Sequence, residues 1–333
     1  MLVEFHLDKN FFDSKCFKDP EIGKFFLNTY AKMWKEFGIL VLPNSADQHS
    51  FWDLAKSSCP QYIQQDLSIM FAYQNKFKIV NSPSSWLEGN IYCEDENQYS
   101  ILKNYFDVLF VDESVYSFLE FFETFQKYDS FNSFEVLKAS ELHNSVLFKN
   151  AEQYTFSEIN IGDTKSNIWS QRFENISKYS KQVTIIDRYF CQNTVKDIKE
   201  SLNTSLKFFF EKLPLNQNIN LSIISAMGNN SNSNFKKFKK HINDILQADL
   251  TIKSKFSSIK LISSKNEYFR DFSHDRYIIF DEKVFRLGKG MVIFSSHDMY
   301  PMTFNLVEKS QSDIARTTKA RLPSYLDHEE LIT

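Results

Sequence analysis

Short apolar runs of strand length alternate with longer amphipathic segments along the whole chain. Clear examples are ILVLP at 39–43 and DVLFV at 107–111 in the first half, and INLSIISA at 219–226 in the second. Apolar runs of about four to eight residues are typical of strands buried on both faces, as in parallel sheets. Because these runs alternate with helical segments, the sequence predicts an α/β fold made of two α/β domains.

Residues 20–37 show how the helices are recognised. Pro20 is tolerated in a first turn, apolar residues recur at spacings of three and four, and Gly38 is a typical stop. The other expected helices are 46–73 with a break at Pro60, 168–180, 195–213 and 235–248; the other expected strands are 2–7, 77–80, 182–190, 258–264, 276–281 and 290–296.

The length of 333 residues predicts about two domains. We expect a first α/β domain over 1–125 and a second over 155–305. Residues 126–154 are the least periodic and are rich in Ser, Asn and Glu, so they are expected to connect the domains. The polar segment 306–333 is expected to form a C-terminal tail.

The net charge and the cysteine spacing argue against a strongly basic nucleic-acid binder and against a disulfide-rich or zinc-binding protein. The net charge of −3 does not indicate a strongly basic nucleic-acid binder, although a local basic patch stays open. The cysteines, Cys16, Cys59, Cys93 and Cys191, lack disulfide or zinc spacing, so free thiols in a reducing cytosol are expected. No signal-peptide core and no apolar run of roughly 18–20 residues is present. We therefore expect a cytoplasmic protein without a transmembrane segment.

The segment from His274 to Gly288 has the most informative spacing. Four residues separate Arg276 from Asp281, and six separate Asp281 from Gly288. On a strand, His274 and Arg276 would project from the same face because they are two residues apart. Arg276 can offer a planar fork of donors to a phosphate, and His274 can attack it or protonate a leaving oxygen. Asp281 would orient a partner imidazole or close a turn.

This spacing resembles the His-x-Lys-x4-Asp-x6-Gly motif of the phospholipase D superfamily, and the resemblance extends over the second domain. More narrowly, HDRYIIFDEKVFRLGKGMVIF at 274–294 is similar to the phospholipase D-like C-terminal domain of MIT-domain proteins. Those proteins carry a similar His-Asp-Arg and a later Gly-(Lys/Arg)-Gly before an apolar strand. They are regarded as phosphoinositide-binding modules and not as enzymes.

The resemblance to the superfamily implies a mechanism. In active members two such motifs face each other, one histidine becomes a phosphohistidine, the other is the general acid, and no metal is needed. This chain has Arg276 in place of the lysine, and Gly288-Lys289-Gly290-Met291 where Gly-Ser-x-Asn often follows. It carries a single motif, so a catalytic pair would require a homodimer.

Further phosphate-site candidates surround the motif. Asp187 and Arg188 end a predicted buried strand, where ligands meet open α/β sheets. Asp187 would hold Arg276 or His274; the alternative is a helix cap or a salt bridge. The basic candidates that would contact a phosphate or a phosphodiester backbone are Arg188, Lys236, Lys237, Lys239, Lys240 and Lys289. The four lysines at 236–240 could equally form a solvated helix face with Phe235 and Phe238 turned inward. His241 and His297 have no motif partner.

The first domain opens with FHLDKNFF at 5–12, which resembles the start of PIN-like nucleases, where a first strand ends in Asp-x-Asn. The resemblance implies clustered carboxylates that bind Mg²⁺ or Mn²⁺ and activate water. Asp8, Asp47 and Asp112 each follow an expected strand, with Glu94 or Asp95 as a further partner. Acidic residues also follow strands simply as turn or N-cap residues.

These observations lead to competing functions. The first is a phosphodiesterase, most specifically a nuclease, that needs no metal. Its His/Arg phosphate site would be formed by His274, Arg276, Asp281 and Asp187. An analogy at the level of the fold suggests an effector of bacterial antiviral defence. This first function implies that the protein binds nucleic acid, has a protein partner in a defence complex and forms a homodimer. The second is a non-catalytic phospholipase D-like module that binds phosphate groups of nucleic acid, nucleotide or phospholipid. A third places metal-dependent activity in the first domain.

Overall fold

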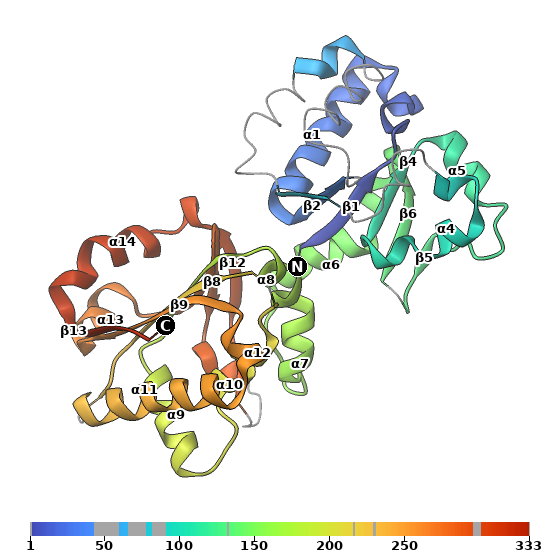
Figure 1. Ribbon diagram of the computed structural model, residues 1–333. Coiled ribbons are helices and arrows are strands. Elements are labelled where there is room, and N and C mark those ends of the chain that lie inside the picture. Colours follow the sequence, from blue (N-terminus) through green and yellow to red (C-terminus); the bar gives the residue numbers. More distant parts are fainter. Residues whose placement is uncertain are drawn as a thin grey trace. The chain divides into compact units, whose positions relative to one another are not determined.

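The computed structural model describes residues 2–42, 60–65, 78–81, 91–131, 133–215, 217–228, 231–295 and 301–332. The chain forms two compact units, 2–152 and 153–333, each with its own sheet and helices (Figure 1). The predicted α/β fold class is therefore confirmed. None of the helices in the described residues is long and apolar enough to cross a membrane.

The first sheet has the strand order β3-β2-β1-β4-β6-β5. Neighbouring strands from β3 to β6 are parallel, and β5 pairs antiparallel with β6. The sheet grows first on one side of β1 and then on the other, which puts a topological switch point at the carboxyl end of β1. The strands are β1 (Val3–Leu7), β2 (Gly38–Leu42), β3 (Lys78–Asn81), β4 (Val108–Val111), β5 (Tyr128–Asp129) and β6 (Phe134–Lys138).

Helices on both faces of this sheet bury its alternating side chains. Phe110 of β4 lies in one cluster with Trp34 and Phe148, whereas the next residue back, Leu109, lies in a second cluster with Tyr116. The α-helices are α1 (Pro20–Phe37), α4 (Glu96–Ser100), α5 (Glu113–Leu119) and α6 (Val146–Phe156); the 3-10 turns are η1 (Phe11–Asp13), η2 (Lys15–Phe17), η5 (Ile91–Cys93), η6 (Leu102–Asn104) and η7 (Ala139–Asn144). The predicted helix 46–73 lies largely outside the described residues.

The second sheet has the order β12-β11-β10-β7-β8-β9-β13. β7, β8 and β9 are parallel, whereas β10, β11 and β12 form an antiparallel meander on one side and β13 pairs antiparallel with β9 on the other. The strands are β7 (Gln182–Ile186), β8 (Ile219–Ser225), β9 (Phe256–Ser264), β10 (Arg276–Phe280), β11 (Lys283–Leu287), β12 (Phe304–Glu308) and β13 (Leu326–Leu331).

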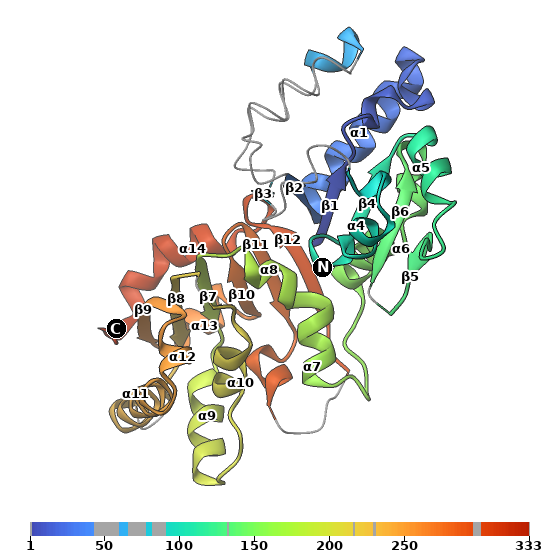
Figure 2. The same cartoon turned by 45° about the vertical axis from the view of Figure 1, so that its right-hand side comes forward.

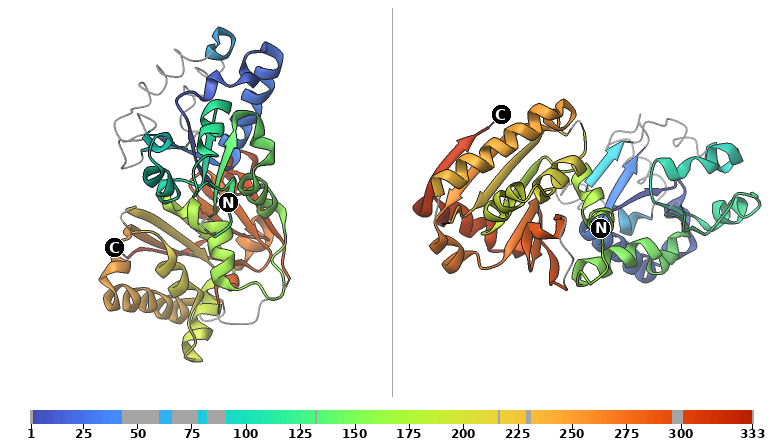
Figure 3. Two further views of the ribbon diagram at one scale, coloured as in Figure 1. Left: turned by 90° about the vertical axis from the view of Figure 1, so that its right-hand side faces the viewer. Right: turned by 90° about the horizontal axis from the view of Figure 1, so that it is seen from below.

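Helices lie on both faces of this sheet (Figure 3). One face carries an aromatic cluster in which the ring of Phe173 lies 4.8 Å from Phe285 and 5.5 Å from Phe294. On the other face Ile186 and Ile224 pack with residues of α13 and α14. The helices are α7 (Lys165–Ile168), a π-helical turn (Trp169–Phe173), α8 (Glu174–Lys178), α9 (Phe190–Lys199), α10 (Ser205–Lys212), α11 (Ser231–Ala248), α12 (Leu250–Lys253), α13 (Asn266–Phe272), α14 (Ile314–Arg321) and the 3-10 turns η9 (Gly290–Phe294), η10 (Lys309–Gln311) and η11 (Leu322–Tyr325).

Two predicted boundaries are wrong. Residues 126–154 are not a connection, because β6 and most of α6 belong to the first unit. Strand β6 was not recognised in the sequence because it contains a charged residue, Glu135. The buried carboxylate of Glu135 accepts hydrogen bonds from Ser145 Oγ at 2.5 Å and from the Val146 N–H at 2.6 Å. The segment 306–333 is not a tail, since it supplies α14 and the polar edge strand β13. Charged residues are common on such edges.

Other elements of the second unit also differ from expectation. The apolar run 290–296 was expected to be a strand, but Gly290–Phe294 forms the 3-10 turn η9. The expected helix 195–213 is divided into α9 and α10, and Thr204 caps α10 by accepting a hydrogen bond from the Lys207 N–H at 3.2 Å. A short apolar run does not distinguish a strand from a buried helical turn.

Arg172 anchors the start of the second unit. Its buried guanidinium donates to the backbone carbonyls of Tyr154, Ser157 and Glu158 at 2.8–3.1 Å, and it lies 4.3 Å from the ring centroid of Phe304. The end of α6 and the residues that follow it are therefore tied to the π-helical turn and to β12.

We expect Arg172→Met to lower the free energy of unfolding of the second unit by about 2–4 kcal/mol, because buried carbonyls lose a charged donor. Urea unfolding read by hydrogen exchange of peptides from β7, β8 and β9 measures the change. Arg270→Met, at an exposed residue paired with its neighbour Asp271, is the control and should change little. Equal stability of the two variants would contradict the anchoring role.

Candidate phosphate site at the carboxyl edge of the second sheet

The carboxyl ends of the three parallel strands gather several predicted site residues at one edge. Asp187 and Arg188 follow β7, and Asn266 begins α13 just after β9. β10 runs in the opposite direction, so Arg276 begins at this same edge with His274 two residues before it. The pairing of Tyr277 with Ile186 brings Arg276 opposite Asp187. The structure therefore brings residues from three segments of the chain, 187–188, 266 and 274–276, to one edge of the sheet.

Asp187 is the buried centre of this edge. Its Oδ1 accepts a hydrogen bond from the Tyr189 N–H at 2.9 Å, and its Oδ2 accepts one from the Met291 N–H at 2.8 Å. Burial raises the pKa of Asp187, while these N–H groups and Arg276 act in the opposite direction. The carboxyl group thus ties the loop after β7 to η9 and faces Arg276, as the sequence suggested.

Two glycines permit this arrangement. Gly290 has a φ of +66°, and a Cβ atom there would lie 2.0 Å from Asp187 Oδ2. The carbonyl of Gly288 accepts a hydrogen bond from Arg276 Nη1. The segment from Gly288 to Met291 therefore supplies an acceptor to Arg276, the Gly288 carbonyl, and a donor to Asp187, the Met291 N–H, and exposed Lys289 lies between them.

The histidine and arginine of the motif differ in their surroundings. Arg276 is half-buried, and its guanidinium lies 5.4 Å from the ring centroid of Tyr189. His274 is exposed, and its ring has no hydrogen bond to another described residue. His274 precedes β10, so the prediction that both residues project from the same face of a strand is wrong.

Asp281 lies at the other end of β10, roughly 15 Å along a strand that rises about 3.3 Å per residue. Its φ is +47°, and its carboxylate accepts hydrogen bonds from the Gln182 N–H at 2.9 Å and the Lys181 N–H at 3.3 Å. It therefore closes the β10–β11 turn and holds the start of β7. It does not orient His274 or Arg276, which corrects its inclusion among the catalytic residues.

A pocket of about 480 Å³ opens beside this edge. Three cations line it, Arg188 and the exposed Lys196 and Lys199 of α9, and no carboxylate belongs to the described residues of its lining. Arg188 donates from Nε to Asn266 Oδ1 at 3.1 Å, and its guanidinium lies 5.2 Å from the Tyr189 ring. Sequence reasoning missed Lys196 and Lys199, although their spacing places them on one face of a helix.

The lysines of α11 lie on a helix whose phenylalanines face inward, which agrees both with a solvated face and with a phosphate-binding face. Lys236, Lys237 and Lys240 are exposed, while Phe235 and Phe238 are buried. Lys239 is engaged in an ion pair with Glu330 of β13. α11 lies beside α9, as Figures 1 and 2 show. His241 contacts Thr204 Oγ1 at 3.0 Å, and His297 lies outside the described residues.

In the first unit, Asp8 and Asp112 follow the adjacent strands β1 and β4 at the switch point. Asp8 is buried and accepts hydrogen bonds from the Tyr92 hydroxyl at 2.6 Å and the Asn10 N–H at 2.7 Å. Asp112 caps α5 by accepting from the Val115 N–H at 2.7 Å. Asp47 lies outside the described residues. Among those described, no group of three or more His, Cys, Asp or Glu side chains could hold a metal ion.

Burial has opposite effects on the pKa values of Asp8, which follows β1, and of His6, which lies within it. It raises the pKa of Asp8 from 3.8 to about 6, and the neighbouring Asp112 adds to this shift. It lowers the pKa of His6 from 6.5 to about 4, while the ring contacts the Val41 carbonyl at 2.8 Å. The switch point thus contains a buried carboxyl group whose pKa is raised to about 6.

Comparisons with known proteins leave the family open. No protein family matches the chain, and no curated protein matches it. Among solved structures, TrmBL2, an archaeal chromatin protein described as showing a novel mode of DNA binding, is 9% identical over 84% of this chain and 81% of that chain. The TM-score of 0.23 is too low to indicate a shared fold, so this similarity supports no conclusion.

We expect Gly290→Ala to destabilise the second unit by at least about 2 kcal/mol more than Gly162→Ala. Both glycines have positive φ, but a Cβ at Gly162 meets nothing within 4 Å, whereas one at Gly290 displaces Asp187. Comparing the two variants therefore separates the cost of the steric clash with Asp187 from the cost of placing alanine at a positive φ. Urea unfolding read by hydrogen exchange measures both. Equal losses would show that the Asp187–Met291 contact contributes nothing.

The raised pKa of Asp8 makes the first unit less stable as pH rises from about 4 through about 6, because the folded state holds this proton more tightly than the unfolded state. Asp8→Asn removes the effect, so the variant should gain up to about 3 kcal/mol relative to wild type by about pH 7. The lowered pKa of His6 has the opposite trend, which cancels in the difference. A pH-independent difference in urea unfolding would contradict this assignment.

Proposed function

We propose that the second unit is a non-catalytic module that binds the phosphate groups of nucleic acid at the carboxyl edge of its sheet. The observation that carries this proposal is the pocket beside Arg188, whose described lining contains three cations and no carboxylate. Lys196 Nζ lies 3.9 Å from Glu200, outside the lining, and such an exposed pair within one helix contributes little and leaves the lysine able to meet a phosphate. Lysine and arginine side chains in such a pocket neutralise phosphates and release counterions, which is the main source of affinity for nucleic acid.

Two further observations favour a polymer over a single phosphate. Asn234 of α11 lines the pocket, and the exposed Lys236, Lys237 and Lys240 follow it in the same helix, so positive charge continues along α11. Tyr189 is 38% exposed. An exposed aromatic ring between guanidinium groups suits stacking with an unpaired base. Single-stranded RNA or DNA is therefore the expected ligand.

Metal-independent phosphodiester cleavage is the second candidate function. It is favoured by the exposed His274 imidazole, which has no hydrogen bond to another described residue and lies at the same edge as Arg276. The resemblance to the phospholipase D superfamily supports this candidate as well. The mechanism needs a second histidine, so it would require two copies of the chain.

Binding is tested by fluorescence anisotropy of labelled single- and double-stranded DNA and RNA across a range of salt. The Lys196→Ala/Lys199→Ala variant should bind at least about tenfold more weakly, and the slope of log K against log salt should fall by about 2. Lys212→Ala/Lys253→Ala removes the same charge from exposed residues outside the pocket and is the matched control. Equal losses in the two double variants would refute a local phosphate site.

Cleavage is tested with the same substrates in wild type, His274→Ala and Asp8→Asn, each with and without EDTA. Stable substrates with wild-type binding support the binding module. Cleavage that resists EDTA and is lost only in His274→Ala supports the second candidate. Cleavage lost with EDTA and in Asp8→Asn would place the activity in the first unit, as the PIN-like resemblance implies. Binding to phosphoinositide vesicles but not to nucleic acid would identify a lipid ligand instead.

A further inference from the structure

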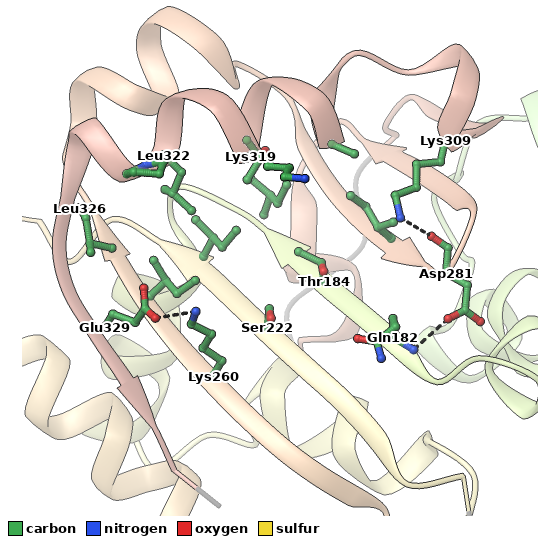
Figure 4. A pocket seen from close by; sticks show the side chains of 17 residues that line it. Gln182, Thr184, Ser222, Lys260, Asp281, Lys309, Lys319, Leu322, Leu326 and Glu329 are labelled. Carbon is green, nitrogen blue, oxygen red and sulfur yellow. Dashed lines mark hydrogen bonds and ion pairs between the residues drawn. The ribbon is translucent and has the colours of Figure 1, made fainter.

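A second pocket, of about 430 Å³, lies between one face of the second sheet and the C-terminal segment α14–η11 (Figure 4). It contains none of the motif residues His274, Arg276 or Asp187 and none of the lining of the cationic pocket described above. Asp281, which closes the β10–β11 turn, lies at its rim. The pocket therefore needs an explanation of its own.

The floor of this pocket is unusual for the centre of a sheet. The registers pair Thr184 with Ser222 and Ser222 with Lys260, so three neighbouring parallel strands place polar side chains in one row. The row beside it consists of Ile186 and Ile224 with Ile262 of β9, all buried. Central parallel strands are normally apolar on both faces.

The polar row is accessible and incompletely paired. Thr184 and Ser222 are half-buried, line the pocket, and have no side-chain hydrogen bond to another described residue. Lys260 forms an ion pair with Glu329 at 2.5 Å. Figure 4 shows the hydroxyl groups of Thr184 and Ser222 on adjacent strands beneath α14. Uncovered hydroxyl groups at a sheet centre are groups that a ligand can bond.

The roof is the helix α14. Ala315, Thr318, Lys319 and Leu322 follow one another at spacings of three, one and three, so they lie on one face and all line the pocket. Leu322 continues the apolar row of the floor by packing in the same cluster as Ile186, Ile224 and Ile262. Lys319 is exposed and has no ion pair with another described residue.

The lining chemistry defines the class of ligand. One side of the pocket is aliphatic, with isoleucine, leucine, alanine and proline, and none of the described lining residues is aromatic. The other side offers three hydroxyl groups, of which that of Thr318 is already bonded to Tyr268, and the carboxylates of Asp281 and Glu329. Of its three lysines, Lys260 is paired with Glu329 and Lys309 with Glu282, which leaves Lys319 without an ion pair to another described residue. Asp281 is already bonded to the N–H groups of β7. Bases favour aromatic stacking, so an aliphatic lining argues against a nucleotide.

We propose that this pocket binds a small aliphatic carboxylate, with its hydrocarbon chain on the isoleucine row and its carboxylate among Thr184, Ser222 and Lys319. The volume falls in the range of about 300–1,000 Å³ that is typical of small-molecule sites. A bound ligand bridges the sheet and α14, so it stabilises the C-terminal segment on the sheet. The site is independent of the nucleic-acid site.

The test uses decanoate as the probe, with the full chain, by isothermal titration calorimetry below the micelle-forming concentration. Decan-1-ol and inorganic phosphate are the comparison ligands. Decanoate should bind more tightly than either, because only it matches both sides of the pocket. Thr184→Val, which keeps the shape, should weaken decanoate about fivefold through loss of one hydrogen bond. Ser222→Leu fills the pocket and should weaken it at least about 100-fold.

Controls separate this site from the phosphate site and from misfolding. Lys196→Ala/Lys199→Ala should leave decanoate binding unchanged, and Ser222→Leu should keep nucleic-acid binding, which also shows that the variant is folded. Lys319→Ala should weaken decanoate but not decan-1-ol, whereas Lys253→Ala should affect neither. No decanoate binding to the wild-type chain, or binding that Ser222→Leu and Thr184→Val both leave unchanged, would overturn the proposal.

Discussion

The carboxyl group of Asp187 is the contact on which the edge of the second sheet depends. It is buried, and it joins two segments separated by 104 residues by accepting hydrogen bonds from the Tyr189 and Met291 N–H groups. A buried carboxylate is costly unless such donors and a nearby cation compensate it. Arg276 provides that cation and is itself held by the Gly288 carbonyl. The positions of β7, β10 and η9 at this edge therefore depend on one another.

The fold class and this edge could be predicted because their signals are local. Apolar runs of strand length mark β2, β4, β8 and β9, and a proline near the start of α1 with a glycine at its end marks the helix limits. Asp187 was expected at a strand end near Arg276, and the register of β10 with β7 brings the two together. The directions of neighbouring strands determine which strand ends lie together at one edge of the sheet.

The features that could not be predicted depend on contacts between distant residues. Glu135 gives β6 a charged residue that only the capping of α6 explains. The polar strand β13 is recognisable only by its pairing with β9. By contrast, Lys196 and Lys199 lie close to Arg188 in the sequence, on the helix α9 that directly follows it, and sequence reasoning missed them because no motif marks them.

At this edge the motif arginine and the pocket cations have different surroundings, and this difference favours phosphate binding over phosphodiester cleavage. Arg276 is half-buried, faces Asp187, donates to the Gly288 carbonyl and lies over Tyr189, so much of its charge is already compensated within the protein. In the proposed binding module, the attraction for a polyanion comes from Arg188, Lys196 and Lys199, which line the pocket. In a cleaving enzyme the motif cation must hold the reacting phosphate beside the nucleophile. Because Arg276 is held by the Gly288 carbonyl and faces Asp187, we propose that it maintains the shape of the edge and that the neighbouring pocket supplies the binding surface.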